Sequence, residues 1–309
     1  MRVLFYGTPA FALPTLHALL ARHRVVAVVT QPDRPRDRGQ RAQASPVKAV
    51  ALEQGIPVLQ PVRLRDPGWP ERLGEHSADV AVVVAFGQIL PAAILGVPAR
   101  GSINVHASLL PRYRGAAPIA WAIMRGETET GITTFQMDTG MDTGAILLQG
   151  PMPIGAEETA GELAARLAVL GAELLVETLD RLATLTPRSQ DSRAATLAPR
   201  LRKEDGLLEW TEPAAVLAAR VRGLNPWPGA VALGPGGRLL IWRARAIAGV
   251  GEPGVLAAVA GRLAVGTGAG FLEPIEVQPE NRRAMEWDAY LRGARLGPGA
   301  PLGATVPRS

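Results

Sequence analysis

The sequence of 309 residues contains no cysteine, two lysines and four histidines, and 5% of its residues are aromatic. Without cysteine, disulfides, thiolate nucleophiles and thiolate metal ligands are excluded. The histidines, which are His17, His23, His76 and His106, lack the close pairs typical of metal centres, so we expect no metal. No apolar run reaches the roughly 20 residues that span a membrane, and the start MRVLFYG lacks the regions of a signal peptide. We therefore expect a cytoplasmic protein with no membrane partner.

Arginine carries nearly all of the positive charge, because the net charge is +5 and the only lysines are Lys48 and Lys203. The planar guanidinium group of arginine can bind two phosphate oxygens at once. A compositional bias of the source genome explains the same excess, together with the many alanines, glycines and prolines. The clustering of the arginines is therefore more informative than their number.

The length and the pattern of apolar runs predict two domains. In the first part of the chain, short β-rich runs alternate with helix-like stretches, which is typical of a parallel sheet built from βα units. The expected strands are residues 2–6, 25–30, 80–85 and 102–105, and the expected helices are residues 14–22 and 46–54. Ser45 should cap the second of these helices. A long helix from Thr159 to about Leu182 should close this domain, residues 1–185.

The remainder of the chain, from residue 186 onward, lacks this alternation of β-rich and helix-like stretches. Residues 186–205 are rich in turn residues and in basic charge, which indicates an extended basic linker. Beyond it, short apolar runs at 230–233, 238–245 and 262–265 are separated by glycine and proline, so residues 206–309 should form a small β-rich domain. Within this domain, the prolines that flank Trp227 predict a rigid, buried corner.

Gly7 directly follows the first expected strand, where the segment GTPAFALP enters a helix and could offer backbone amides to an anion. The second and third glycines of a dinucleotide fingerprint are missing, so a nicotinamide cofactor is not expected. As an isolated feature, Gly7 fits an ordinary turn between a strand and a helix.

Asn104 and His106 stand at the carboxyl end of an expected central strand, which is where open α/β sheets bind their ligands. Alternation along the strand puts both side chains on the same face. Histidine exchanges protons near neutral pH, and an amide donor can stabilise a developing oxyanion. Taken alone, such a pair is a packed polar couple at least as often as a catalytic one.

Two further segments could contribute to a site. The loop SLLPRYRGAAPI, residues 108–119, is too apolar for an ordinary solvated connection and opens a helix at Pro118. The segment QMDTGMDTG, residues 136–144, holds Asp142 between two glycines in a tight turn. A carboxylate so placed could orient a nearby histidine.

Taken together, Asn104, His106, SLLPRYRGAAPI and DTGMDTG resemble the folate-dependent formyltransferase superfamily, because three separated segments agree in order and spacing. FYGTPAFALP, VTQPDRPRDRGQ, SPVKAVA, VVVAFGQILP and LNPWPGA are similar to the members that formylate methionyl-tRNA, so the resemblance spans nearly the whole chain. It implies an α/β fold, in which a Rossmann-like formyltransferase domain with a parallel-rich central sheet is followed by a smaller OB-like β-barrel domain.

The resemblance implies that Asn104, His106 and Asp142 are catalytic and that 10-formyltetrahydrofolate is the co-substrate. An amine would attack the formyl carbon, and Asn104 with protonated His106 would stabilise the oxyanion of the tetrahedral intermediate. Asp142 would favour the imidazolium and help to move the proton that the amine loses. Ala107 departs from the family, which often has glycine there, and this narrows the backbone conformations allowed. The implied folate contacts are Ser108, Leu109, Leu110, Pro111 and Asp138, with Phe86, Gly87, Gln88, Ile89 and Leu90 at the pterin ring.

The acceptor has to be inferred from features outside these catalytic residues, and they favour initiator methionyl-tRNA. Residues 31–45 form a long polar excursion with a cluster of arginines that could reach an RNA acceptor stem. Arg38 matches the key basic position of the tRNA enzymes that the chain resembles, although on charge alone an unstructured basic loop explains the cluster slightly better. The basic linker could add phosphate contacts. The expected tRNA contacts are Arg34, Arg36, Arg38, Arg41, Arg200, Arg202 and Lys203.

Three alternatives stay open, of which a folate hydrolase-type activity is the least favoured, because such domains normally sit within longer chains. A sugar-nucleotide amine formyltransferase would share the catalytic residues, the folate loop and an OB-like tail, but its small acceptor needs no arginine-rich loop. A non-catalytic RNA-binding protein on a formyltransferase scaffold is the alternative from another class, and the intact Asn104, His106 and Asp142 argue against it. We expect the protein to act as a monomer.

Overall fold

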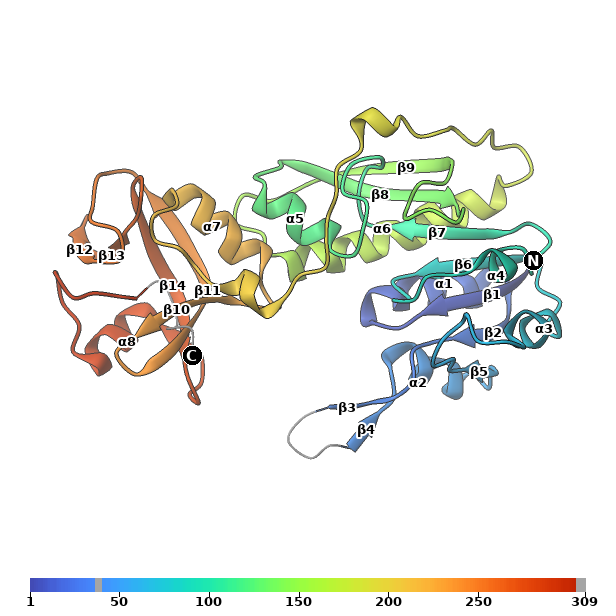
Figure 1. Ribbon diagram of the computed structural model, residues 1–309, viewed down its shortest axis with the longest axis horizontal. Coiled ribbons are helices and arrows are strands. Elements are labelled where there is room, and N and C mark those ends of the chain that lie inside the picture. The colour runs from blue at the N-terminus through green and yellow to red at the C-terminus, as the bar shows by residue number, and fades with distance from the viewer. Residues whose placement is uncertain (37–40, 304–309) are drawn as a thin grey trace. The chain divides into compact units, whose positions relative to one another are not determined.

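A computed structural model describes residues 1–36 and 41–303 of the chain (Figure 1). The chain forms two compact units, each assembled from separate stretches of sequence. The first unit holds residues 1–115, 129–153 and 164–198, and the second holds 116–128, 154–163 and the chain from Pro199 onward. Within the described ranges, no helix combines the length and the apolar character that crossing a membrane requires.

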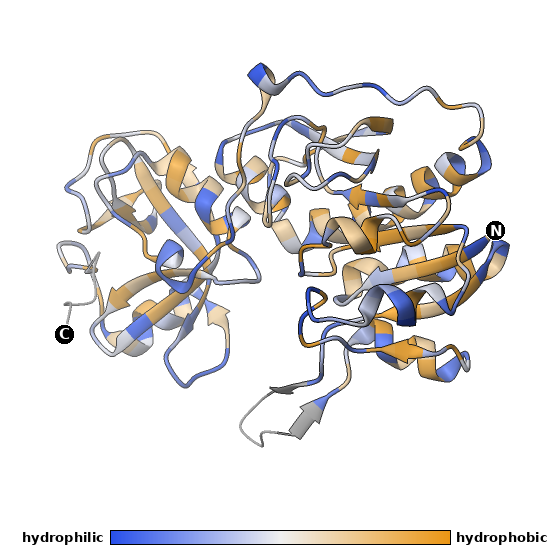
Figure 2. Ribbon diagram, turned by 45° about the vertical axis from the view of Figure 1, so that its right-hand side comes forward, coloured by the Kyte–Doolittle hydropathy of each residue, from blue (hydrophilic) through white to orange (hydrophobic). Residues whose placement is uncertain are grey.

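The first unit is built on a seven-stranded sheet with the strand order β5-β2-β1-β6-β7-β8-β9 (Figure 1). The strands are β1 (Arg2–Gly7), β2 (Arg24–Val29), β5 (Val58–Leu59), β6 (Val80–Val84), β7 (Ser102–His106), β8 (Glu129–Gln136) and β9 (Ile146–Pro153). The first five strands pair in parallel, whereas β8 runs antiparallel to both β7 and β9. Figure 2 shows the central strands as continuous apolar runs, as expected for parallel strands covered on both faces.

The helices of the first unit fix which side chains of the sheet face the site. They are α1 (Leu13–Arg22), α2 (Pro46–Glu53), α3 (Trp69–Gly74), α4 (Ala92–Leu95) and most of α6 (Ala160–Asp180). Gly171 of α6 lies so close to the sheet that a Cβ there would come within 3.0 Å of Val105 Cγ1. Val105 of β7 therefore faces α6, and its neighbours Asn104 and His106 face the opposite side.

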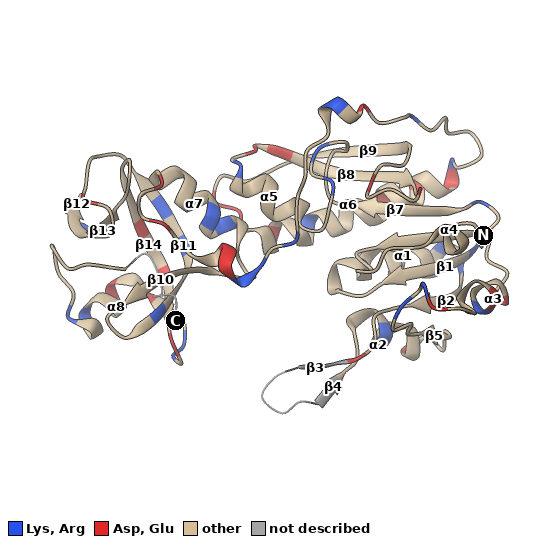
Figure 3. Ribbon diagram, viewed as in Figure 1, with Lys and Arg blue, Asp and Glu red and all other residues tan. Residues whose placement is uncertain are grey.

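The second unit contains an antiparallel sheet with the order β10-β11-β14-β13-β12, and β15 pairs with β14. The strands are β10 (Ala230–Gly234), β11 (Gly237–Ile247), β12 (Leu256–Val259), β13 (Arg262–Gly266), β14 (Phe271–Pro279) and β15 (Met285–Glu286), and the helices are α5 (Pro118–Met124), α7 (Ala214–Gly223) and α8 (Trp287–Ala294). Its core gathers around Trp210, Leu217 and Trp287. Charges are interleaved on this sheet (Figure 3), where the buried Glu273 pairs with Arg245 and Arg262.

The structure confirms the fold class, because a parallel-rich α/β sheet is followed by a smaller antiparallel β unit. The expected strands and helices of the first unit are present, with ends that differ by at most two residues. The capping of α2 is also confirmed, since Ser45 Oγ accepts a hydrogen bond of 3.1 Å from Lys48 N.

The expectation of a buried corner at Trp227 is wrong, because 52% of this side chain is exposed. The polypeptide is anchored there by other groups. Asn225 Nδ2 donates to Trp242 O at 2.9 Å, and Asn225 O accepts from Gly161 N at 3.0 Å. The backbone of the motif is therefore fixed while its tryptophan faces solvent.

Candidate active site

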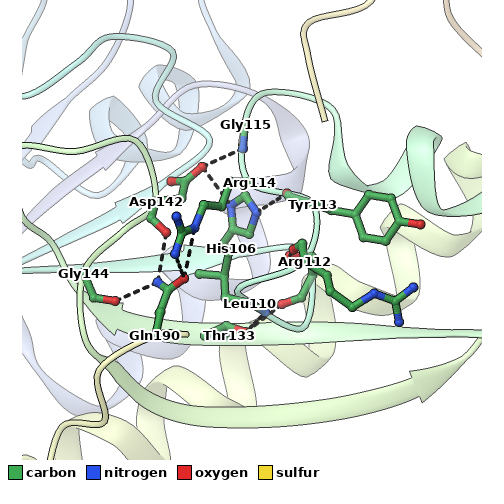
Figure 4. A network of polar contacts seen from close by, with 11 residues as sticks. His106, Leu110, Arg112, Tyr113, Arg114, Gly115, Thr133, Asp142, Gly144 and Gln190 are labelled. Carbon is green, nitrogen blue, oxygen red and sulfur yellow. Dashed lines mark hydrogen bonds and ion pairs between the residues drawn. The ribbon is translucent and has the colours of Figure 1, made fainter. Parts of the chain in front are cut away.

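His106 ends β7 at the carboxyl edge of the parallel strands, and it is 7% exposed. Its Nε2 lies 2.9 Å from the carbonyl oxygen of Tyr113, and its Nδ1 lies 3.7 Å from Asp142 Oδ2 (Figure 4). The ring of Phe135 packs edge-on at a centroid distance of 6.5 Å. The hydrogen bond at Nε2 and the carboxylate that faces Nδ1 orient the imidazole, which is what a proton-transferring histidine requires.

Asn104 lies two residues before His106 on the same strand, and its side chain is partly exposed. The amide of Asn104 and the imidazole of His106 therefore share one face of β7, while the intervening Val105 is buried. This places a neutral hydrogen-bond donor beside a titratable one, an arrangement that can stabilise negative charge on a substrate oxygen.

Asp142 sits in the turn between β8 and β9 with a positive φ of 56°, in the left-handed region that non-glycine residues rarely adopt. Its Oδ2 accepts a hydrogen bond of 2.8 Å from Gly115 N, so the carboxylate is held between a backbone donor and the His106 ring. A Cβ at Gly144 would come within 1.8 Å of Gln136 O, which explains the second glycine of the motif.

Asp138 stabilises the same turn from within. Its Oδ1 accepts hydrogen bonds from Gly140 N at 3.0 Å and from Thr143 Oγ1 at 2.7 Å. One carboxylate oxygen of this predicted folate contact is thus engaged in holding the backbone that carries Asp142.

The loop after β7 is tied down by its own polar groups. Ser108 Oγ donates to Arg112 O at 2.6 Å, and Thr133 Oγ1 of β8 donates to Ser108 O at 2.6 Å. The same Thr133 oxygen accepts from Leu110 N at 3.0 Å (Figure 4). Gln149 Nε2 donates to Leu110 O at 2.9 Å, so the predicted folate loop has a defined shape.

The loop after β6 offers an apolar surface through a single side chain. Phe86 and Leu90 are buried, and the Phe86 ring packs against Tyr6 at a centroid distance of 5.4 Å. Gln88 turns inward, where its amide bonds Leu64 N and Pro61 O. Ile89, in contrast, is 87% exposed, and it is the large apolar side chain that this loop presents to solvent.

The predicted tRNA contacts fall in two regions of the chain. Arg34 and Arg36 lie in β3 (Arg34–Arg36) and Arg41 in β4 (Arg41–Gln43), which pair as an antiparallel hairpin, whereas Arg38 lies outside the described residues. In the second unit, the exposed side chains of Arg200, Arg202 and Lys203 form a separate basic stretch.

The base of the β3–β4 excursion is anchored by Asp33. Lys48 Nζ donates to Asp33 Oδ2 at 2.6 Å, and Gln60 Nε2 donates to Asp33 Oδ1 at 2.8 Å. These hydrogen bonds, that from Lys48 first, hold the pKa of Asp33 below its ordinary value. The carboxylate of Asp33 is therefore balanced by Lys48.

The sequence did not indicate Gln190, whereas Tyr113 lies in the loop at residues 108–119 that it did indicate. Gln190 bonds the backbone of the Asp142 turn and the side chain of Arg114, and the carbonyl of Tyr113 bonds His106 (Figure 4). No metal site accompanies them, since residues 1–36 and 41–303 contain no cluster of three His, Asp or Glu side chains that could hold a metal ion.

Comparison with known families matches almost the entire chain. Residues 1–179 match the formyl transferase family model, and residues 200–295 match the model for the formyl transferase C-terminal domain. A methionyl-tRNA formyltransferase from Citrifermentans bemidjiense is 50% identical over 307 residues, which cover 98% of this chain and 96% of the relative. One from Solibacter usitatus is 50% identical over 308 residues, which cover 98% of this chain and 99% of the relative.

Solved structures share the fold at low sequence identity. WlaRD, a sugar 3N-formyltransferase, has a TM-score of 0.67 and 17% identity, covering 92% of this chain and 99% of that one. An N-formyltransferase from Helicobacter canadensis has a TM-score of 0.66 and 18% identity, with 89% and 99% covered. HypX from Aquifex aeolicus, solved with tetrahydrofolic acid, has a TM-score of 0.64 and 17% identity, with 96% and 48% covered.

Proposed function

The chain belongs to the formyl transferase family, and we propose that it transfers the formyl group of 10-formyltetrahydrofolate to the α-amino group of methionine on initiator tRNA. The observation that carries this proposal is 50% identity to methionyl-tRNA formyltransferases over 98% of the chain. The sugar formyltransferases are 17% and 18% identical, so their likeness supports the fold and leaves the acceptor to the closer relatives. The intact His106–Asp142 pair disfavours a purely RNA-binding role.

The proposed chemistry is a direct transfer through a tetrahedral intermediate. The amino nitrogen attacks the formyl carbon, the bond from that carbon to the folate nitrogen breaks, and the amine loses a proton while the folate nitrogen gains one. Asn104 and His106 stabilise the oxyanion from one face of β7. Asp142 stabilises the imidazolium, because its carboxylate faces Nδ1 at 3.7 Å.

His106 needs one change of partner to act as the donor to that oxygen. Its Nε2 bonds the carbonyl oxygen of Tyr113 at 2.9 Å, so this N–H has to exchange the backbone acceptor for the substrate oxygen. The contact between Nδ1 and Asp142 does not have to change in this step. Asp142 would thus keep the ring oriented while the hydrogen bond from Nε2–H moves from the Tyr113 carbonyl to the substrate oxygen.

We assign the folate contacts to Ser108–Pro111, Phe86–Leu90 and Asp138. The loop after β6 suits a pterin ring, because Ile89 presents an exposed apolar side chain beside the carboxyl ends of the parallel strands. The Phe86 side chain is buried and the hydroxyl of Ser108 already donates to Arg112 O, so these two residues would contact the folate through backbone groups.

We assign the tRNA contacts to the β3–β4 excursion, including Arg38, and to Arg200, Arg202 and Lys203. Arginines on a hairpin can reach phosphates without reading sequence, which suits positioning of an acceptor stem. In this assignment residues 1–185 form the catalytic domain, 186–205 the basic linker and 206–309 the tRNA-binding domain. We further propose that the enzyme acts as a monomer in the cytoplasm, where charged tRNA and folate are found.

The function is tested by following donor and acceptor together. The purified protein is mixed with 10-formyltetrahydrofolate and methionine-charged initiator tRNA, and tetrahydrofolate and formyl-methionyl-tRNA are quantified by mass spectrometry. We expect the two products in equal amounts, with none in the control that contains uncharged tRNA. Release of tetrahydrofolate without formyl-methionyl-tRNA would contradict the proposed acceptor.

A further inference from the structure

We propose that Gln190 is a positioning residue of the active site, which holds the Asp142 turn so that its carboxylate stays against His106. This inference rests on the proposed function, because it gives Gln190 a role through the catalytic pair. Gln190 belongs to the segment that the sequence predicts as a linker, and in the structure its side chain bonds Arg114 and the backbone of the Asp142 turn (Figure 4).

The amide nitrogen of Gln190 binds the Asp142 turn at two points. Its Nε2 donates to Asp142 O at 2.9 Å and to Gly144 O at 2.7 Å. An amide has two N–H donors, so both are used on the backbone that carries the carboxylate. A single side chain therefore fixes the residue that faces His106 and the glycine that closes the turn.

The turn needs such support, because Asp142 has a positive φ of 56°. For a non-glycine residue this conformation is unfavourable and persists only where the surroundings enforce it. The neighbouring Met141 is 61% exposed, so solvent rather than packing covers that side of the turn. The hydrogen bonds from Gln190 and from Gly115 N hold Asp142 in this conformation.

The amide oxygen of Gln190 binds the side chain of Arg114, in the loop that follows β7. It accepts from Arg114 Nε at 3.1 Å and from Arg114 Nη2 at 2.7 Å, and Arg114 is buried with 9% exposed. Arg114 is flanked by Tyr113, whose carbonyl bonds His106 Nε2, and by Gly115, whose N–H bonds Asp142. Gln190 thus connects the two segments that hold the imidazole, one at each ring nitrogen.

The chemistry of this position is specific to glutamine. All four hydrogen-bonding positions of the amide are occupied, with the oxygen toward a cation and the nitrogen toward two carbonyls. Glutamate could accept from Arg114 but could not donate to Asp142 O and Gly144 O. Methionine would fill a similar volume without any of the four hydrogen bonds.

Backbone pairing fixes the place of Gln190. Before it, Arg188 exchanges two hydrogen bonds of 2.8 Å with Ile146 of β9. After it, Thr196 O accepts from Arg114 N at 2.8 Å, and Ala198 N donates to Arg114 O at 2.7 Å. The side chain is therefore presented to the site from a segment that is anchored on both sides.

The experiment compares Gln190→Met, Gln190→Glu and the control Ser189→Ala, an exposed neighbour in the same segment. For Gln190→Met we expect kcat to fall by up to about 100-fold, because small displacements of catalytic groups have effects of this size. The KM values for folate and for methionyl-tRNA should change by less than about threefold. We expect kcat of Gln190→Glu to be lowered as well, whereas Ser189→Ala should keep the wild-type kcat.

Amide exchange supplies a readout that does not depend on activity. Gly115 N–H donates to Asp142 Oδ2, so its hydrogen exchange reports whether the carboxylate is in place. We expect exchange at Gly115 to become at least about tenfold faster in Gln190→Met and to stay unchanged in Ser189→Ala. Unchanged protection of Gly115 in Gln190→Met would overturn the positioning role, even if the wild-type protein failed to formylate methionyl-tRNA.

A double-mutant cycle with Asp142→Asn tests whether Gln190 acts through Asp142. If it does, Gln190→Met should change kcat by less than about threefold in the Asp142→Asn background. The proposal would be contradicted if the double variant lost kcat by the product of the two single-variant factors. It would also be contradicted if Gln190→Met raised KM and left kcat unchanged. Absence of formyl-methionyl-tRNA with the wild-type protein would instead reject the proposed function, and Gly115 exchange would still decide the role of Gln190.

Discussion

At the scale of single residues, the central feature is His106, with a backbone carbonyl hydrogen-bonded at Nε2 and a carboxylate facing Nδ1. The Tyr113 carbonyl and the Asp142 carboxylate come from loops 7 and 36 residues further along the chain. The sequence indicated Asp142 through its glycines, but Gln190 has partners 48 and 76 residues away and stands in a polar segment without periodicity. Local patterns carry no signal for such contacts. For Trp227 the prediction failed in another way. The flanking prolines indicated a rigid backbone, but they do not determine whether the tryptophan side chain faces the core or the solvent.

His106→Ala should lower kcat for formyl transfer by about 100-fold to 10,000-fold, as expected when a proton-transferring group is lost. The KM for methionyl-tRNA should change by less than about threefold, since the side chain is nearly buried and the proposed mechanism brings it into contact with the substrate only at the formyl oxygen. Steady-state kinetics with both substrates varied measure these constants. A parallel loss of kcat and of tRNA affinity would argue that His106 has a structural role instead.

At the scale of elements, the parallel strands β1, β2, β6 and β7 were predictable because they are short apolar runs, whereas the two-residue β5 and the antiparallel β8 and β9 were not. The sequence of β9 contains Gly150, Pro151 and Pro153, which normally interrupt strands. The strand tolerates them because β9 lies at the edge of the sheet. In β8, buried threonines replace apolar residues, and Thr134 is satisfied by a hydrogen bond of 2.8 Å to Thr178 of α6. Satisfying these hydroxyls requires the tertiary structure, which no local pattern reveals.

The first turn of α6 leads to a prediction about pH. Glu162 accepts from Thr159 N and Thr159 Oγ1 at 2.8 Å each and pairs with Arg243 at 2.5 Å. These contacts, the Thr159 backbone first, lower the pKa of Glu162 from 4.5 to about 2. Because the folded pKa is depressed, the stabilisation is complete above pH 4.5 and is lost as the pH falls toward 2.

Glu162→Gln should therefore lower the free energy of unfolding near pH 7 by about 1 kcal/mol at most, since the side chain is half exposed and screened. Chemical denaturation as a function of pH measures the difference from the wild type, which should narrow between pH 4.5 and 2. The control is Glu53→Gln, at an exposed position at the end of α2. An equal and pH-independent difference in both variants would argue against the capping contacts as the cause.

At the scale of the whole molecule, a net charge of +5 carried by arginine suits a polyanionic acceptor. Arg38→Ala should raise the KM for methionyl-tRNA and leave kcat at saturating tRNA within about threefold, because a phosphate contact affects binding. It should also reduce the dependence of tRNA affinity on the logarithm of salt concentration by about one unit.

The matched control is Arg24→Ala, because Arg24 is exposed at the amino-terminal end of β2, opposite the carboxyl edge that holds His106. Steady-state formylation at several salt concentrations compares the two variants. Equal effects of both substitutions would show that overall charge matters and that the β3–β4 excursion has no special role.

The assignment of the acceptor is tested by the ratio of kcat/KM for methionyl initiator tRNA to kcat/KM for an amino-sugar nucleotide, with 10-formyltetrahydrofolate as the common donor. If the protein binds the tRNA as well as its reacting amine, the ratio should be at least about 1,000. This corresponds to roughly 4 kcal/mol of transition-state discrimination. A ratio below one would contradict the assignment of the acceptor while leaving formyl transfer itself intact.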